Sequence, residues 1–195
     1  NILRPTDHEH LADLGAYRGD TIAELLHFAG GCERVFAFEP DEKTHKKLCL
    51  AVEQMGLAGR ATCVQMAAYS HQQTLEFDSR GGRQSALREE SLVTGAAGAA
   101  KPKIKLVQGQ SLDNVAGEET VTLINMDVEG AERQALEGCA KIIARDRPKM
   151  LIAVYHRSED LFAIPLQIAA MRSDYRFYLR HYPYIPAWDT NLYCV

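Results

Sequence analysis

The sequence predicts an α/β protein built on a doubly wound, mostly parallel sheet. Two observations lead to this prediction. Apolar runs of strand length alternate with amphipathic segments of helix length along most of the chain, an alternation typical of parallel α/β sheets. A glycine-punctuated turn at residues 13–21 (DLGAYRGDT) joins the first apolar run to the first amphipathic segment. Such a turn can present the free N–H groups of a helix start to a ligand.

The composition bounds the size and class of the protein. With 195 residues, 46% hydrophobic and 25% charged, the chain is predicted to form one globular domain, residues 1–195. A net charge of -4 argues against a nucleic-acid partner, because phosphate binding needs clustered basic residues. The five cysteines are scattered, without metal-ligand spacing, which favours reduced thiols in the cytoplasm.

Targeting segments are not evident. No apolar run has the length of a membrane span, and no secretory signal pattern opens the chain, so we expect a soluble, cytoplasmic protein without a membrane partner. The chain begins at Asn1 rather than at an initiator methionine. It is therefore open whether an N-terminal portion of the natural protein is absent from this sequence. The sequence does not constrain the oligomeric state.

The first strand and helix flank the glycine turn. Residues 10–14 are a short apolar run, predicted as a strand mainly because of the turn that follows. Residues 21–29 carry apolar side chains at helical spacing and stop at Gly30 and Gly31. Glycine at this place is a signal for a helix C-terminus, so the helix is predicted to end there.

A second strand and helix follow. Residues 34–38 are predicted as a buried strand. Pro40 or Asp41 suits the start of the next helix, because proline fits a first turn and an acid complements the helix dipole. This helix is predicted to run to about Met55, and residues 61–66 form the third strand.

The middle of the chain has weaker patterns. Residues 74–77 are predicted as an extra short strand and residues 104–107 as another. Between them, residues 79–102 are dominated by Gly, Ala, Ser and charge, which predicts a mobile surface loop with some local helix. This loop could be a lid over a site or an insertion without a role.

Order returns in the second half of the chain. Residues 121–126 form a predicted buried central strand, and residues 150–155 form another. Between them, residues 131–144 are predicted to be helical, with a break near Gly138.

The last elements are one helix and two strands. Residues 161–171 are predicted to be helical, with Pro165 marking a restart of the helix rather than its middle. Residues 175–179 and 191–195 alternate like strands. These two strands could pair antiparallel at the edge of the sheet.

The turn and the acid that follows it predict a cofactor containing adenosine. Glu39 lies about two dozen residues beyond the glycine turn, and an acid at this spacing typically binds a ribose diol. A dinucleotide would need G-x-G-x-x-G, but counting from Gly15 the later glycine positions hold Tyr17 and Asp20. Asp20 would repel a pyrophosphate and attract an ammonium group, which favours S-adenosylmethionine over NAD(P).

Three motifs together resemble the FkbM-type methyltransferase family. They are DLGA with Gly19, FAFEP at residues 36–40 and MDVEGAE at residues 126–132. The resemblance covers almost the whole chain, including Arg147-Pro148 and Tyr155-His156 around the strand at residues 150–155. It implies a Rossmann-like class I methyltransferase fold, with a mostly parallel seven-stranded sheet whose last strand is antiparallel, and S-adenosylmethionine as cofactor.

The resemblance also implies a reaction. Members usually methylate a hydroxyl on a sugar or secondary metabolite, so we expect an O-methyltransferase with a small hydroxylated substrate, possibly a glycan. The family commonly has Asn where this chain has Tyr17, so the contact made by that side chain is open.

The candidate cofactor-binding residues lie at strand ends and in the glycine turn. Glu39 is expected to accept hydrogen bonds from the ribose diol, with an acid serving the helix dipole as the alternative. Gly15 and Gly19 are expected to lie over the cofactor or to be plain turn glycines, and Asp13 to orient the turn or meet the ammonium group. The full set is Asp13, Gly15, Ala16, Tyr17, Gly19, Asp20, Glu39 and Asp127.

Asp127 and His156 are the candidate catalytic residues. Methyl transfer from a sulfonium is an in-line displacement in which the protein positions an oxygen and removes its proton. His156 is expected to be the base, with a structural histidine as the alternative, while Tyr155 is expected to pack. Asp127, Glu129 and Glu132 also fit an acidic cluster at a helix N-terminus. Carboxylates can hold a hard cation, but nothing in this spacing demands one, so no metal is predicted.

Two other functions stay open. An NAD(P)-dependent oxidoreductase could use a similar fold, although the missing glycines speak against it. A non-catalytic cofactor-binding module would bind the cofactor without turning over a substrate.

Overall fold

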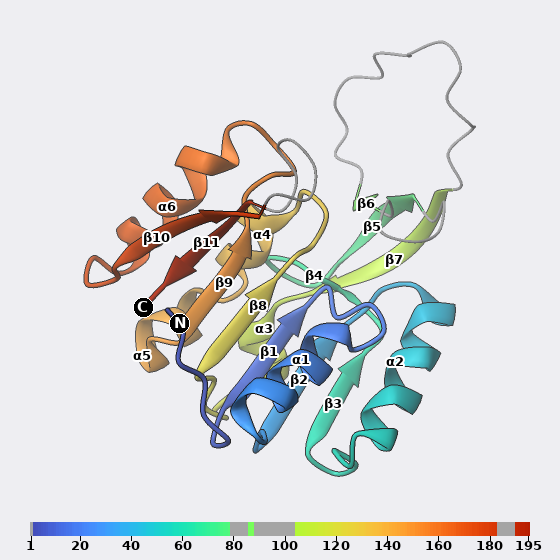
Figure 1. Cartoon of the computed structure of the whole chain (residues 1–195). Helices are drawn as coiled ribbons and strands as arrows, with labels where there is room; N and C mark the ends of the chain where they lie inside the picture. Colours follow the sequence, from blue (N-terminus) through green and yellow to red (C-terminus); the bar gives the residue numbers. More distant parts are fainter. Residues whose placement is uncertain (1, 79–85, 88–103, 183–189) are drawn as a thin grey trace.

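The computed structural model of the chain describes residues 2–78, 86–87, 104–182 and 190–195. Its centre is a seven-stranded sheet with the strand order β10-β11-β9-β8-β1-β2-β3 (Figure 1). These strands are β1 (His10–Leu14), β2 (Arg34–Phe38), β3 (Ala61–Val64), β8 (Leu123–Met126), β9 (Lys149–Ala153), β10 (Phe177–His181) and β11 (Thr190–Cys194). Neighbouring strands from β9 to β3 are parallel, and β11 is antiparallel to both of its neighbours. The predicted α/β class and seven-stranded sheet with an antiparallel last strand are confirmed.

Helices cover both faces of this sheet. One face carries α1 (Asp20–Ala29) and α2 (Glu42–Gln54). The other carries α3 (Leu112–Ala116), α4 (Glu132–Glu137), α5 (Ala140–Asp146) and α6 (Asp160–Met171). The division follows from the period of two in a strand, which sends successive side chains to opposite faces. In β1, Leu11 packs with α1 and α2, whereas Ala12 and Leu14 pack with the other helices.

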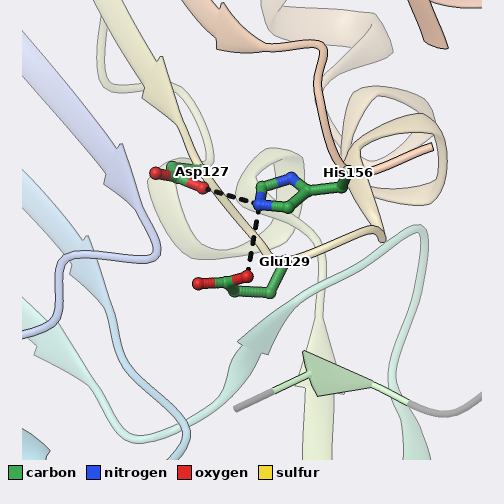
Figure 2. A group of neighbouring side chains, drawn as sticks. All are labelled: Asp127, Glu129 and His156. Atoms are coloured by element: carbon green, nitrogen blue, oxygen red, sulfur yellow. Dashed lines mark ion pairs between the residues drawn. The ribbon is translucent and has the colours of Figure 1, made fainter. Parts of the chain in front are cut away.

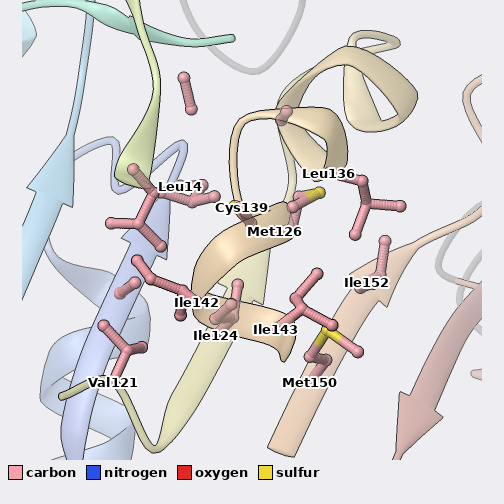
Figure 3. Close-up of a cluster of buried hydrophobic side chains, with 14 of the residues drawn as sticks. Leu14, Val121, Ile124, Met126, Leu136, Cys139, Ile142, Ile143, Met150 and Ile152 are labelled. Atoms are coloured by element: carbon pink, nitrogen blue, oxygen red, sulfur yellow. The ribbon is translucent and has the colours of Figure 1, made fainter. Parts of the chain in front are cut away.

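The larger core lies between the sheet and the second group of helices. Figure 3 shows Ile124 and Met126 of β8 and Ile152 of β9 beside Leu136 of α4 and Ile142 of α5. All five side chains are almost completely buried. This apolar layer holds β8 and β9 side by side, and it therefore sets the positions of the residues that follow these two strands.

A smaller second sheet extends the fold beside β3. It has the order β4-β7-β5-β6, with β4 (Ala67–Ala68), β5 (Gln73–Asp78), β6 (Ala86–Leu87) and β7 (Ile104–Gln110). The predicted short strands at residues 74–77 and 104–107 are confirmed as parts of β5 and β7. The predicted strand at residues 61–66 is too long, because β3 ends at Val64 and the chain then pairs with β7 through β4.

The predicted loop at residues 79–102 lies mostly outside the described residues. Within it, Ala86–Leu87 pairs antiparallel with β5 as β6, so at this point the chain is a strand rather than a loop.

Two helical predictions have clear outcomes. The break near Gly138 is confirmed, because α4 ends at Glu137 and α5 begins at Ala140. The prediction that Pro165 restarts a helix is wrong, because α6 runs without interruption through it. Proline has a helical φ and costs one backbone hydrogen bond, while the buried residues Ile164 and Ile168 on the same helix hold it against the sheet. Helix α3 was not predicted.

The packing of α4 leads to a stability prediction. Replacing the fully buried Leu136 with Ala should lower the free energy of unfolding by about 3 kcal/mol, because it removes apolar contacts and leaves a cavity. Leu50→Ala in α2, where Leu50 is 55% exposed, should cost less than about 1 kcal/mol. Urea denaturation of both variants measures the difference, and equal losses would contradict this description of the core.

Candidate functional site

Four polar residues predicted from the sequence gather at the carboxyl edge of the sheet. Strands β9, β8, β1 and β2 are parallel neighbours, so their carboxyl ends share one edge (Figure 1). Asp13 is the penultimate residue of β1, Glu39 directly follows β2, Asp127 directly follows β8, and His156 lies shortly after β9. Ligands of open α/β sheets bind at this edge.

The glycine turn after β1 connects the ends of β2 and β8. The backbone N–H groups of Gly15 and Ala16 donate to the carbonyl oxygen of Phe38, at 3.2 and 2.8 Å. Gly15 has φ +92°, and a Cβ placed on it would lie 2.0 Å from the carbonyl oxygen of Asp127. Glycine is therefore required here by the close approach of the chain's own backbone.

The rest of the turn leads into α1. Ala16 is buried, Gly19 caps the helix with φ +85°, and Asp20 is the exposed first residue of the helix. Tyr17 also has a positive φ, +48°. Its ring contacts the guanidinium group of Arg18, which lies 4.9 Å from the ring centroid.

Glu39 is buried beside this turn. Its carboxylate accepts hydrogen bonds from the backbone N–H groups of Asp41, at 2.8 Å, and Tyr17. Burial is the main cause that raises the pKa of Glu39 to about 7, and the charge of Asp41 adds to it. The acid that caps α2 is Asp41, which accepts from the backbone N–H of Thr44. Asp41 therefore caps α2, and the carboxylate of Glu39 lies between the start of that helix and the glycine turn.

Asp13 is completely buried at the end of β1. The side-chain amide of Asn125 in β8 donates to its Oδ1 at 2.8 Å, and its Oδ2 has no hydrogen-bond partner within the described residues. Burial raises the pKa of Asp13 to about 7, and the charges of Asp127 and Asp20 act in the same direction.

His156 lies among three carboxylates (Figure 2). Its Nδ1 is 2.8 Å from Oε1 of Glu132, and its Nε2 is 3.2 Å from Oε2 of Glu129 and 3.5 Å from Oδ1 of Asp127. Burial alone would lower the pKa of His156, but hydrogen bonds to Glu129 and Glu132 and the charge of Asp127 outweigh it and raise the pKa to about 10. At neutral pH these carboxylates therefore favour a protonated ring.

Two residues have contacts that the sequence did not predict. Tyr155 was expected only to pack, but its hydroxyl donates to Oδ2 of Asp127 at 3.2 Å. Glu132 is the first residue of α4, yet its fully buried carboxylate also accepts from the backbone N–H groups of Val128 and Gly130. Glu132 thus holds the loop and the ring of His156 together. The spacing D-x-E-x-x-E was visible in the sequence, but the pairing with a residue 24 positions later was not.

A groove on the α1 face of the sheet is separate from these residues. It has a volume of about 420 Å³ and is lined by Leu25 and Phe28 of α1, Leu123 of β8, Leu151 of β9 and Tyr193 of β11, among others. None of the candidate cofactor-binding or catalytic residues lines it. Within the described part of the chain, no helix is long and apolar enough to cross a membrane.

Comparison with protein families identifies the class of protein to which this chain belongs. The model of the methyltransferase FkbM domain matches residues 13–186. The chain therefore belongs to the FkbM family of methyltransferases. No curated protein matches the sequence.

Solved structures agree with this assignment. The structure of methyltransferase FkbM from Methylobacillus flagellatus KT is 28% identical, with a TM-score of 0.79, covering 100% of this chain and 45% of that chain. This chain thus spans less than half the length of that relative. A Streptococcus mutans protein in complex with S-adenosylhomocysteine (14% identity, TM-score 0.56, 99% and 91% covered) shares the fold. So does Aeropyrum pernix fibrillarin with bound S-adenosylmethionine (15%, TM-score 0.52, 97% and 67% covered).

The contact of Gly15 with the end of β8 predicts the effect of a side chain there. Gly15→Ala should lower the free energy of unfolding by about 3 kcal/mol or more, because the new Cβ meets a backbone carbonyl and the positive φ is strained. Gly59→Ala is the matched control: its φ is +79°, and a Cβ meets nothing within 4 Å. It should cost about 1 kcal/mol. Equal losses in thermal or urea denaturation would contradict the contact.

The burial of Asp13 predicts a pH dependence of stability. Its pKa is about 7 in the folded protein, whereas a solvated aspartate has an ordinary pKa of 3.8, so the unfolded chain releases this proton at lower pH. As the pH rises from about 4 to 7, the free energy of unfolding of the wild type should therefore fall relative to that of Asp13→Asn, by at most about 1.4 kcal/mol per pH unit. Above pH 7 the difference should level off. Urea denaturation at several pH values measures this difference. A difference that does not change with pH would show that the carboxyl is not buried as described.

Proposed function

We propose that the chain is the catalytic domain of an S-adenosylmethionine-dependent O-methyltransferase that acts on a hydroxyl of a small molecule, such as a sugar or secondary metabolite. Membership of the FkbM family supports methyl transfer. Two proteins that share the fold carry S-adenosylhomocysteine or S-adenosylmethionine. The observation that carries the cofactor assignment is the buried carboxylate of Glu39, directly after β2 and beside the glycine turn.

The proposed cofactor contacts follow from the edge of the sheet. Glu39 accepts hydrogen bonds from the ribose hydroxyls, and the turn from Gly15 to Gly19 lies along the cofactor. Asp13 and the exposed Asp20 bring negative charge to the same end of β1. An acidic surrounding suits a cofactor with a sulfonium and an ammonium group and no phosphate. The ring of Tyr17, stacked with Arg18, is the part of the turn whose contact with the cofactor we leave unassigned.

The proposed reaction is an in-line displacement. The acceptor oxygen forms a bond to the methyl carbon as the carbon–sulfur bond breaks, S-adenosylhomocysteine leaves, and the hydroxyl proton passes to the protein. We assign proton removal to Asp127 and His156. Since the carboxylates favour a protonated His156, Asp127 is the member of the pair that accepts the proton. His156, whose Nε2 lies 3.5 Å away, orients the carboxylate and stabilises its charge.

The acceptor class is tested by a substrate screen that follows release of S-adenosylhomocysteine. Hydroxylated sugars and polyketides form one arm, and RNA forms the other. Turnover confined to the hydroxylated small molecules would support the proposal, and turnover of RNA alone would contradict it. His156→Ala and Asp127→Asn should abolish turnover while leaving the fold intact. A protein that binds cofactor but turns over none of these compounds would fit a cofactor-binding module instead.

Glu39 provides the test of the cofactor site. Glu39→Gln should weaken S-adenosylmethionine binding at least tenfold, because a charged acceptor for the ribose hydroxyls becomes neutral, a change of about 1.5–3 kcal/mol. Glu42→Gln is the control, since Glu42 is an exposed acid in the first turn of α2 that pairs with Lys46. Isothermal titration calorimetry measures both affinities, with NAD as a negative control ligand. No binding by the wild type, or equal affinity in both variants, would exclude the proposed cofactor site.

A further inference from the structure

Three atoms that commonly bind metals converge beyond the ends of β8 and β9. They are a carboxylate oxygen of Asp127, a carboxylate oxygen of Glu129 and a ring nitrogen of His156, here called the Asp-Glu-His trio, and they lie within 4.8 Å of one another. Figure 2 shows both carboxylates pointing toward the same ring nitrogen. The distances from that nitrogen are 3.2 Å to Glu129 and 3.5 Å to Asp127.

We propose that the Asp-Glu-His trio binds one divalent metal cation. Ligand atoms about 2.1 Å from a metal ion, at right angles to one another, are about 3 Å apart. The two distances from Nε2 exceed this spacing by only a few tenths of an ångström. A cation bound there would replace the proton on Nε2 of His156. Relative to that nitrogen, each carboxylate would need to move by only a few tenths of an ångström.

The ring of His156 is already oriented for a cation. Its Nδ1 is 2.8 Å from Oε1 of Glu132, and the side chain of Glu132 is completely buried. The same oxygen of Glu132 accepts from the backbone N–H groups of Val128 and Gly130, so it cannot easily move. A carboxylate that holds one ring nitrogen and turns the other toward the ion is the usual support of a histidine ligand.

The electrostatics of the trio also favour a cation. Asp127, Glu129 and Glu132 surround a single imidazole, so their negative charge exceeds what one ring can neutralise. Oδ1 of Asp127 is a buried atom that no group in the described residues satisfies by a hydrogen bond, and it faces Nε2 of His156. A cation between them would supply the missing partner of this oxygen.

The ligands indicate the kind of cation and its use. Two carboxylates and one imidazole suit ions that accept both oxygen and nitrogen, for which Mn²⁺ is a suitable probe. Three protein ligands leave coordination positions open for water or for the acceptor. This use rests on the proposed function: the cation would bind the acceptor hydroxyl, polarise it and make its proton easier to remove.

Mn²⁺ titration of the purified protein without S-adenosylmethionine tests the site. Calorimetry should show one Mn²⁺ per chain in the wild type and at least tenfold weaker binding in Glu129→Gln, because a charged ligand is lost. Glu137→Gln, an exposed position in α4, should bind as the wild type does. Asp127→Asn should show the same loss as Glu129→Gln, so the result does not depend on the folding of one variant.

The outcomes separate this proposal from the proposed function. No Mn²⁺ binding by the wild type, or unchanged binding in both ligand variants, would overturn the metal site. The S-adenosylmethionine titration is carried out separately, without Mn²⁺. A protein that binds Mn²⁺ through the trio but not S-adenosylmethionine would contradict the proposed function and support the metal site.

Discussion

The site depends on the turn that follows β1 and on its contacts with the ends of two other strands. The N–H of Asp127 donates to the carbonyl of Leu14, while the N–H groups of Gly15 and Ala16 donate to the carbonyl of Phe38. These bonds join the ends of β8, β1 and β2 through backbone groups alone. The carbonyl of Asp127 occupies the place where Gly15 would carry a Cβ. The arrangement of the candidate side chains at these strand ends therefore depends on a glycine at position 15.

A second feature of the edge is its concentration of buried acids. Asp13 and Glu39 lose much of their hydration, which raises the pKa of each to about 7. Carboxylates in this state gain most from a positively charged partner. The cofactor that we propose carries a sulfonium and an ammonium group, and the metal that we propose carries two charges at the Asp-Glu-His trio. The positive groups of the cofactor would lie near Asp13, Glu39 would accept hydrogen bonds from its ribose hydroxyls, and the metal would bring positive charge to the trio at the neighbouring strand ends.

Many elements could be predicted from local patterns. The bounds predicted for β1 and β2 agree with the structure. The glycine turn marks the end of β1, and an apolar run that stops before Glu39 and Pro40 marks β2. The break at Gly138 was predicted because glycine interrupts an otherwise helical pattern. The uninterrupted α6 was not, because the cost of Pro165 is local whereas the burial of Ile164 and Ile168 depends on the sheet.

The elements that were missed depend on distant partners. Strand β4 has two residues, and it exists because Ala67 pairs with Gly109. Helix α3 has five residues and begins after Ser111, whose hydroxyl accepts from the N–H of Asn114. Such short segments carry too little periodicity to be recognised, and isolated short helices are unstable without tertiary packing.

The sequence by itself determined the class of the fold, the family and the identity of the polar residues at the strand ends. Periodicity and turn residues act over a few positions, so they can be read along the chain. Only the tertiary structure decided how these residues pair. Glu132 holds His156, Tyr155 donates to Asp127, and Glu129 turns toward the same ring. These contacts join the loops after two strands, and their geometry follows from the packing of β8 and β9 against α4 and α5, which no local pattern records.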